Sequence, residues 1–225
     1  GRPLFNQAIS GEHPPGSVFK LAVASGALQE GVVTIDDIVL DPGEIVITNR
    51  YFPNDPGKTR KVVCWKRDGH GEVDFITGIS KSCDVYFYAL GGGYDDGGVS
   101  GGGLGIDLIH DYALMLGYDD FTGIELPGES KGIIPSRDWK RLNVGENWST
   151  GDTYITSIGQ GYVLATPLQV LNSFTPFINN GTLIKPTLIR EVIDGEGNLV
   201  EQFTPGIIHQ TPLSNHVIEQ MGLGM

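Results

Sequence analysis

Three residues that cannot continue a helix, Pro14-Pro15-Gly16, stand directly before a helical pattern and fix where that helix begins. Proline lacks the backbone N–H that a helix interior needs, and glycine breaks regular structure. Between Ser17 and Gly31, apolar residues recur at helical spacing, at Val18, Phe19, Leu21, Ala22, Ala24 and Leu28. The sequence therefore predicts a helix that begins at Ser17, and this helix start constrains the fold more than any other stretch.

Ser17 and Lys20 lie three residues apart at this helix start, a spacing that places both on one helix face. The pattern predicts the Lys20 amine beside the Ser17 hydroxyl, at the positive end of the helix. A serine hydroxyl is a weak nucleophile, and a neutral amine beside it can take its proton. Serine is also a common N-cap, and one Ser-x-x-Lys is expected by chance about once in a chain this size. The pair alone leaves both interpretations open.

Charge and composition limit the kinds of partner and the size of the fold that this chain can have. With 15 basic and 27 acidic residues, the formal net charge is −12, which disfavours binding to nucleic acid or another polyanion. The 225 residues suggest one domain or one and a half, and 40% hydrophobic residues suffice for a core. No apolar run has the length of a membrane span and no signal peptide is present. We expect an excised piece of a longer protein, with any membrane anchor upstream of Gly1.

Periodicity and turn residues predict several helices and a few short strands. After the first helix, helices are expected from Asp74, after a break at residues 80–84, and at 106–116, 166–180 and near Pro212. Strands are expected at 44–48 and in a hairpin of 187–193 with 199–203. Residues 50–72 and 128–152 are expected to be irregular, with packing roles for Trp65, Trp139 and Trp148.

Residues 91–105 hold nine glycines with Asp95 and Asp96, a composition that predicts a flexible surface insertion. The stretch does not fit Gly-x-Gly-x-x-Gly. The segment Gly57-Lys58-Thr59 lacks the earlier glycine of a P-loop, because position 52 is Phe. We therefore exclude nucleotide binding.

A second hydroxyl lies at Ser82-Cys83-Asp84, in the predicted break between two helices, where polar groups can project into a cleft. Ser and Asp also favour ordinary helix–helix turns. Ser-x-x-Lys followed about 60 residues later by Ser-x-Asn/Asp resembles the penicillin-binding proteins and class A β-lactamases, whose motif set is Ser-x-x-Lys, Ser-Asp-Asn and Lys-Thr-Gly.

Further stretches resemble one branch of that family, the class B, elongation-type D,D-transpeptidases (penicillin-binding protein 2). The resemblance runs in order from about Gly16 to Ile184 and on into the predicted hairpin. The stretches that carry it are Pro15–Lys20, Asp41-Pro42-Gly43, Trp65 with Gly69-His70-Gly71, Ser82–Asp84, Tyr118 with Thr122-Gly123-Ile124, Gly151-Asp152-Thr153, Ser157–Tyr162 and Ala165–Gln169.

The resemblance implies roles for four residues in a serine acyl-enzyme reaction that needs no cofactor. Ser17 would attack the penultimate D-Ala carbonyl of a D-Ala-D-Ala stem peptide, and its backbone N–H would supply half of the oxyanion hole. Lys20 would accept the Ser17 proton, although the base is disputed in this superfamily. Ser82 would relay a proton to the leaving amine and bind Lys20. Asp84, where many relatives carry Asn, would contact Lys20 or the substrate.

The resemblance also implies a fold and a setting. Residues 1–225 would form a partial transpeptidase domain of α+β class, the helix-rich part of the penicillin-binding/β-lactamase-like fold with its central sheet largely outside the chain. Lys-Ser/Thr-Gly occurs nowhere in the sequence. We expect that motif beyond Met225, and we expect the isolated piece to be inactive or poorly folded.

The implied partners are peptidoglycan stem peptides, β-lactams and a membrane glycan polymerase of the elongation machinery. The implied location is the outer side of a bacterial cell membrane. Two alternatives remain open: a β-lactamase, for which no Glu can be assigned as the deacylation base, and a β-lactam sensor or inactive scaffold of the same fold.

Cys64, His70 and Cys83 are metal-ligating residue types within 20 residues, although their spacing is not that of a standard zinc finger. Asp41 could be a fourth ligand, and tetrahedral zinc accepts such a set. The resemblance points the same way, because some elongation-type relatives carry zinc at these positions. A Cys64–Cys83 disulfide, as in exported proteins, and two buried thiols beside a structural His70 are the alternatives.

Overall fold

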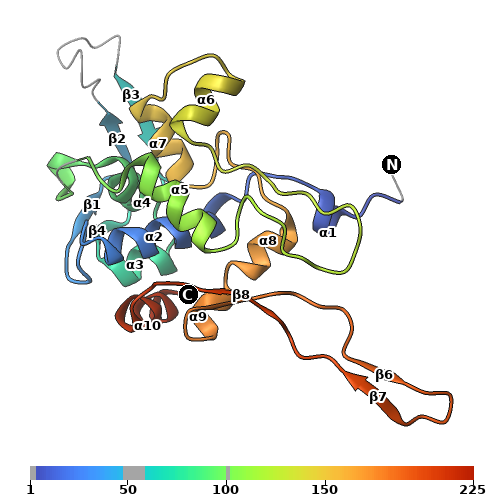
Figure 1. Cartoon of the computed structure of the whole chain (residues 1–225). Helices are drawn as coiled ribbons and strands as arrows, with labels where there is room; N and C mark the ends of the chain where they lie inside the picture. Colours follow the sequence, from blue (N-terminus) through green and yellow to red (C-terminus); the bar gives the residue numbers. More distant parts are fainter. Residues whose placement is uncertain (1–3, 48–58, 100–101) are drawn as a thin grey trace.

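The body of the molecule is a bundle of short helices with small strand pairs at its edges (Figure 1). The structure is a computed structural model and describes residues 4–47, 59–99 and 102–225. Its helical segments are α1 (Gln7–Ser10), the 3-10 turn η1 (Gly16–Phe19), α2 (Lys20–Gln29), α3 (Phe75–Ser80), α4 (Asp84–Gly92), the 3-10 turn η3 (Asp95–Gly97), α5 (Gly105–Met115), α6 (Arg137–Asn143), α7 (Thr150–Ser157), α8 (Pro167–Asn172), α9 (Thr175–Ile178) and α10 (Asn215–Gly224).

The strands of the described residues form antiparallel pairs only, and each sheet has two strands. β1 (Val39–Asp41) pairs with β4 (Gly71–Val73), β2 (Glu44–Ile47) with β3 (Arg60–Val63), β5 (Thr182–Ile184) with β8 (Ile207–Gln210), and β6 (Glu191–Ile193) with β7 (Leu199–Gln202). Many helices with small antiparallel sheets make an α+β fold, as predicted from the sequence.

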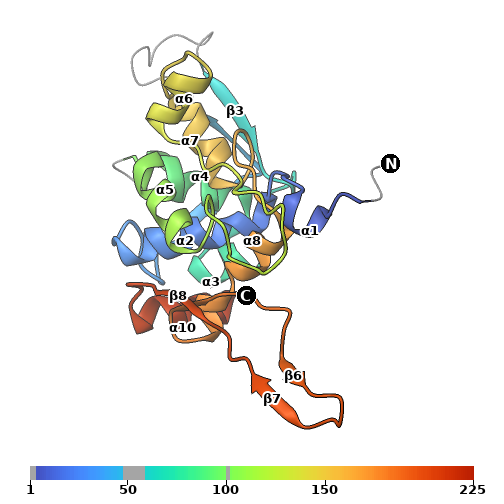
Figure 2. The same ribbon diagram turned by 45° about the vertical axis from the view of Figure 1, so that its right-hand side comes forward.

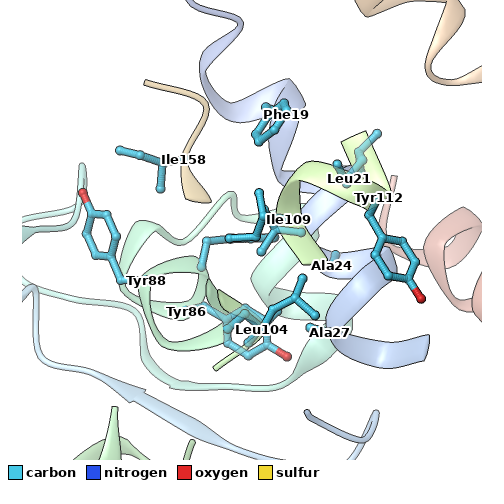
Figure 3. Close-up of a cluster of buried hydrophobic side chains, with 14 of the residues drawn as sticks. Phe19, Leu21, Ala24, Ala27, Tyr86, Tyr88, Leu104, Ile109, Tyr112 and Ile158 are labelled. Atoms are coloured by element: carbon cyan, nitrogen blue, oxygen red, sulfur yellow. The ribbon is translucent and has the colours of Figure 1, made fainter. Parts of the chain in front are cut away.

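Helix α2 runs through the centre of the body, and α3, α4, α5 and α10 pack against it (Figures 1 and 2). Its residues 21–27 are all buried, and most of them are small. The small side chains allow close approach: a Cβ on Gly26 would lie 2.7 Å from Leu104 Cδ2 and 2.9 Å from Tyr112 Cδ2. Figure 3 shows this cluster, in which Ile109 also takes part. Dense packing on every side holds α2 rigidly, and with it the turn that precedes it.

The predicted break between two helices is present. Helix α3 ends at Ser80, and α4 begins at Asp84 with Cys83 as its N-cap. Between them Ser82 has a φ of +50°, a left-handed conformation that costs a non-glycine residue free energy. Three residues thus link the two helices, and Ser82 among them contacts Lys20 at the start of α2.

Helix α6 and the start of α7 lie where the sequence predicted irregular structure, so the prediction for residues 128–152 was wrong in part. Ser136 caps α6, and Ser149 with Asp152 forms a capping box at the start of α7. These caps satisfy N–H groups that a helix start leaves unpaired. The helix expected at 166–180 is divided into α8 and α9, since Pro176 lies in the first turn of α9 and cannot extend α8.

The irregular structure predicted for residues 50–72 was also wrong in part, because β3 and the first residues of β4 lie there. Residues 48–58 lie outside the described residues. They include the last residue of the strand predicted at 44–48 and the first part of the stretch predicted to be irregular at 50–72. The hairpin predicted around residues 194–198 is present as β6 and β7, and it projects away from the helical body (Figures 1 and 2). Strands β1, β5 and β8 were not predicted.

The described part of the glycine-rich stretch 91–105 contains the end of α4, η3 and the start of α5. Tyr94 pairs with Val99 in an isolated bridge, and Val99 and Leu104 are buried. Within the described residues, no helix is both long and apolar enough to cross a membrane.

Candidate active site

Ser17 lies on the outer surface of the η1 turn, directly before the buried helix α2. Proline 15 and Gly16, which has a φ of +61°, bend the chain into this turn. The Lys20 N–H donates to the Ser17 carbonyl, so the first turn is a tight 3-10 turn. The exposed Ser17 hydroxyl is therefore carried by a backbone whose next residues are anchored in the core.

Lys20 is only 2% exposed, and its amine is bound by two residues of the α3–α4 link. Nζ donates to the Ser82 carbonyl (2.8 Å), to the Ser82 Oγ (3.0 Å) and to Asp84 Oδ1 (2.6 Å). The ring of Phe87 lies 5.2 Å from the same amine. Three residues predicted from the sequence as one constellation, Lys20, Ser82 and Asp84, are thus in contact.

The predicted position of the Lys20 amine beside the Ser17 hydroxyl stays a prediction, because the contacts of this amine are with Ser82 and Asp84. No hydrogen bond joins the Lys20 amine to the Ser17 hydroxyl in this structure, and the amine is turned towards Ser82 and Asp84. The physical reason is charge, since an ammonium–carboxylate hydrogen bond is stronger than one to a neutral hydroxyl. Spacing along the helix places Ser17 and Lys20 near each other but does not decide which partner the amine takes.

The turn at Gly159 contacts the η1 turn and holds it in place. The Gly159 carbonyl accepts the Gly16 N–H at 2.9 Å. Gly159 has a φ of +68°, and a Cβ there would lie 2.6 Å from Phe19 Cβ and would overlap the Gly16 carbonyl. Only glycine satisfies both the backbone conformation and the close approach, so this turn fixes the position of residues 16–19.

Trp65, predicted to serve packing, is instead 61% exposed beside the site. Its backbone N–H donates to Asp84 Oδ2 (2.9 Å), and its indole Nε1 donates to the carbonyls of Lys81 (3.2 Å) and Ser82 (3.1 Å). The sequence analysis did not predict these hydrogen bonds, because no periodic pattern of residues indicates a contact between a tryptophan and distant backbone carbonyls.

A cluster of four possible metal ligands lies next to this site, since one of them, Cys83, stands between Ser82 and Asp84 in the chain. Its members are Asp41, Cys64, His70 and Cys83. Each offers one ligand atom, and these atoms all lie within 4.8 Å of one another. Oδ2 of Asp41 lies 2.7 Å from His70 Nδ1 and 3.2 Å from Cys83 Sγ, and Cys64 Sγ lies 3.5 Å from the same His70 nitrogen. The sequence predicted these four residues as a set, and the fold brings them together from β1, from the segment after β3 and from the start of α4.

The electrostatics of the cluster follow from its burial. Burial opposes ionisation of Asp41, but hydrogen bonds from the Gly43 N–H, His70, Cys83 and Cys64 outweigh it and hold the pKa of that carboxyl below its usual value. Burial, then the nearby Asp41 charge, raises the pKa of the Cys83 thiol. The predicted alternative of a disulfide is not present, since both cysteines are free and buried.

The four donors match what zinc binds. Two thiol sulfurs, one imidazole nitrogen and one carboxylate oxygen are all donor types that zinc takes, and four is the number of ligands in its structural sites. The Asp41 carboxylate also accepts the backbone N–H groups of Gly43 and His70, which orient it. The residues present therefore suit a zinc ion.

The whole sequence, residues 1–225, matches the family described as "Penicillin binding protein transpeptidase domain". The chain belongs to this transpeptidase family. It is similar to the peptidoglycan D,D-transpeptidase MrdA of Haemophilus influenzae, with 34% identity over 208 residues, 92% of this chain and 29% of that protein. The transpeptidase chain thus spans less than a third of the length of this relative.

Solved structures agree with the assignment to the transpeptidase family. A crystal structure of Pseudomonas aeruginosa PBP2 in complex with WCK 5153 is 34% identical, with a TM-score of 0.78 over 99% of this chain and 44% of that chain. A second structure, titled as showing coordination of polymerization and crosslinking by a peptidoglycan synthase complex, is 25% identical, with a TM-score of 0.71 over 98% of this chain and 33% of that chain. The resemblance to penicillin-binding protein 2 drawn from the motifs is confirmed.

Proposed function

We propose that the protein containing this chain is a peptidoglycan D,D-transpeptidase that forms an acyl-enzyme on Ser17. The observation that carries the proposal is the buried Lys20 amine, bound by Ser82 and Asp84 below the exposed turn of Ser17. A buried amine with a hydroxyl at hydrogen-bond distance is the arrangement that moves protons to and from a serine nucleophile. Membership of the transpeptidase family supports the substrate class.

In the proposed reaction, Ser17 Oγ attacks the carbonyl carbon of the penultimate D-Ala, and its proton passes to Lys20. Lys20 reacts in its neutral form, and it passes the proton that it gains from Ser17 on to the Ser82 hydroxyl, 3.0 Å away. The C–N bond breaks, and the departing D-Ala amine takes a proton from Ser82. The amine of a second stem peptide then attacks the ester, which releases the cross-linked peptide and restores Ser17.

Asp84 keeps the amine in place throughout, through its 2.6 Å contact with Lys20. The Ser17 N–H stabilises the oxyanion from one side. We place the second oxyanion donor and the carboxylate-binding groups on a Lys-Ser/Thr-Gly strand outside these residues, so this chain alone is inactive. β-Lactams, which resemble D-Ala-D-Ala, acylate Ser17 in the same way.

The proposal also covers the cellular location of the protein and its partner. The catalytic part faces the extracytoplasmic side of a bacterial membrane, where its substrate lies. It works with a membrane glycan polymerase of the elongation machinery, and the similarity to a chain of a peptidoglycan synthase complex supports this partner.

Fluorescent penicillin labelling of the full-length protein tests the function. We expect stable labelling of the wild type and none of Ser17→Ala. Rapid release of hydrolysed drug would indicate a β-lactamase, and absence of labelling would indicate an inactive scaffold. Stable labelling without cross-linked product from stem peptides would indicate a β-lactam sensor. Each of these three results would overturn the transpeptidase proposal.

We also propose that Asp41, Cys64, His70 and Cys83 hold a structural zinc ion. Bound there, zinc would supply four ligand bonds that tie β1, the segment after β3 and the start of α4 together. The ligands Cys64 and Cys83 are chain neighbours of Trp65 and of Ser82 and Asp84. The ion would therefore hold the backbone on which Trp65, Ser82 and Asp84 lie, without touching the reacting atoms.

A further inference from the structure

The Ser82 carbonyl accepts hydrogen bonds from two side chains. Lys20 Nζ donates to it at 2.8 Å and the indole Nε1 of Trp65 at 3.1 Å. The same indole N–H also reaches the Lys81 carbonyl at 3.2 Å. Lys81 is the C-cap of α3, so the indole covers carbonyls that the end of this helix leaves without a backbone partner.

The backbone of Ser82 needs such support because its conformation is strained. Its φ of +50° is uncommon for a residue with a Cβ, and such conformations persist only where surrounding contacts hold them. The rotation of this residue sets the directions of both its carbonyl and its hydroxyl, and Lys20 binds both. A contact that fixes the carbonyl therefore also fixes the hydroxyl.

Trp65 holds the neighbouring acid as well. Its backbone N–H donates to Asp84 Oδ2 at 2.9 Å, while Oδ1 of the same carboxylate binds Lys20 at 2.6 Å. The indole ring meets the His70 ring edge-on, with centroids 5.3 Å apart, and remains 61% exposed. A ring that is so exposed contributes little to the core, so burial does not explain its position.

We propose that Trp65 is a positioning residue, whose indole and backbone N–H groups hold Ser82 and Asp84 in the orientation in which both bind the Lys20 amine. The inference rests on the proposed acyl-enzyme function. Loss of the indole N–H frees Ser82 to leave its left-handed conformation. In a fraction of the molecules the Ser82 hydroxyl then turns away from Lys20. Acylation therefore becomes slower, while the affinity for the β-lactam stays the same.

Stopped-flow acylation of the full-length protein by a fluorescent penicillin tests the role of Trp65. Trp65→Phe keeps a ring against His70 and removes only the N–H donor. Trp148→Phe is the matched control, because its indole N–H also donates one hydrogen bond, to Thr153 Oγ1 at 2.8 Å, away from the site. The first-order acylation constant at saturating drug counts only folded molecules that bind it, so partial unfolding does not obscure the result.

We expect Trp65→Phe to lower the acylation constant about 5- to 10-fold, the effect of losing one hydrogen bond, with the Kd for the drug within about twofold. Trp148→Phe should leave both within about twofold. An unchanged acylation constant in Trp65→Phe, or an equal loss in Trp148→Phe, would overturn the positioning role. Absence of acylation in the wild type would overturn the proposed function itself, which distinguishes the two failures.

Discussion

Lys20 Nζ and Asp84 Oδ1 lie 2.6 Å apart in a pair whose lysine is almost fully buried. Two charges removed from water in this way are favourable only when hydrogen bonds satisfy them, and here Ser82 supplies both a carbonyl and a hydroxyl to the amine. The pair fixes the amine in place beside the Ser82 hydroxyl, the group that relays a proton in the proposed reaction.

The first prediction concerns the base. Lys20→Arg keeps a positive charge for Asp84, but a guanidinium does not lose its proton near neutral pH and cannot accept the Ser17 proton. We expect the acylation constant to fall by about 10²–10⁴-fold, the usual contribution of a general base. Stopped-flow labelling with fluorescent penicillin measures it.

Lys131→Arg is the control for this substitution, because Lys131 also pairs with an aspartate, Asp120, at 3.2 Å but on the exposed surface. It should label at the wild-type rate. If Lys20→Arg were acylated as fast as the wild type, Lys20 would not be the base, and its contact with Asp84 would be purely structural.

The second prediction concerns the turn that supports the nucleophile. A methyl group on Gly159 would overlap the Gly16 carbonyl, so Gly159→Ala should displace the Ser17 turn and lower both stability, by about 3 kcal/mol, and the acylation constant. Gly145 has a similar left-handed φ, +78°, with nothing within 4 Å of an added Cβ, so Gly145→Ala should cost only about 1 kcal/mol with normal acylation. Equal effects of the two changes on thermal unfolding would refute the overlap.

Sequence patterns predicted the parts of the fold that local signals control. The break before Asp84 and the hairpin around residues 194–198 were placed correctly, whereas the helix predicted from Ser17 is a 3-10 turn at Gly16–Phe19 followed by α2 from Lys20. Helices α6 and α7 were missed, although Ser149 and Asp152 carry a capping box, because the stretch is polar and lacks an apolar stripe. Strands β3 and β4 were missed because each has only three or four residues, too few for a clear alternating pattern.

The site was predictable as a set of residues but not as a geometry. Sequence motifs predicted Lys20, Ser82 and Asp84 as site residues. The types of the side chains predicted the possible metal ligands Asp41, Cys64, His70 and Cys83. The orientation of the Lys20 amine depends on Asp84, 64 residues away in the chain, and helical spacing holds no information on it. Trp65 was misjudged for the same reason, since its hydrogen bonds go to backbone carbonyls, which sequence patterns do not reveal.

Metal removal gives the third prediction. If zinc binds only the folded cluster, chelation should lower the melting temperature of the full-length protein, because a ligand bound only to the folded state stabilises it. Metal analysis should find about one zinc per chain in the wild type, with little in Cys64→Ser, whose melting temperature should not change on chelation. No metal in either protein would contradict the zinc site and leave two buried thiols.

The last prediction concerns stability in acid. Lys140 and Asp152 form a largely buried ion pair of 2.7 Å, and Asp152 also accepts the Ser149 N–H and hydroxyl. Burial opposes the Asp152 charge, but these hydrogen bonds outweigh it and hold the pKa of that carboxyl below 3.8. The folded state thus binds the proton less tightly than the unfolded state. The stabilisation from this carboxylate is present above pH 3.8 and is lost as the pH falls through the lowered pKa.

Asp152→Asn should therefore lower the free energy of unfolding by about 3 kcal/mol near neutral pH, as expected when one partner of a buried pair is removed. The difference from the wild type should shrink below pH 3.8, where the wild-type carboxylate also becomes protonated. Asp138→Asn removes an exposed pair with Arg141 and should change stability by less than about 1 kcal/mol. Thermal unfolding of the three proteins across this pH range measures the effect. A difference that persists unchanged in acid would mean that the Asp152 charge is not what stabilises the α6–α7 segment.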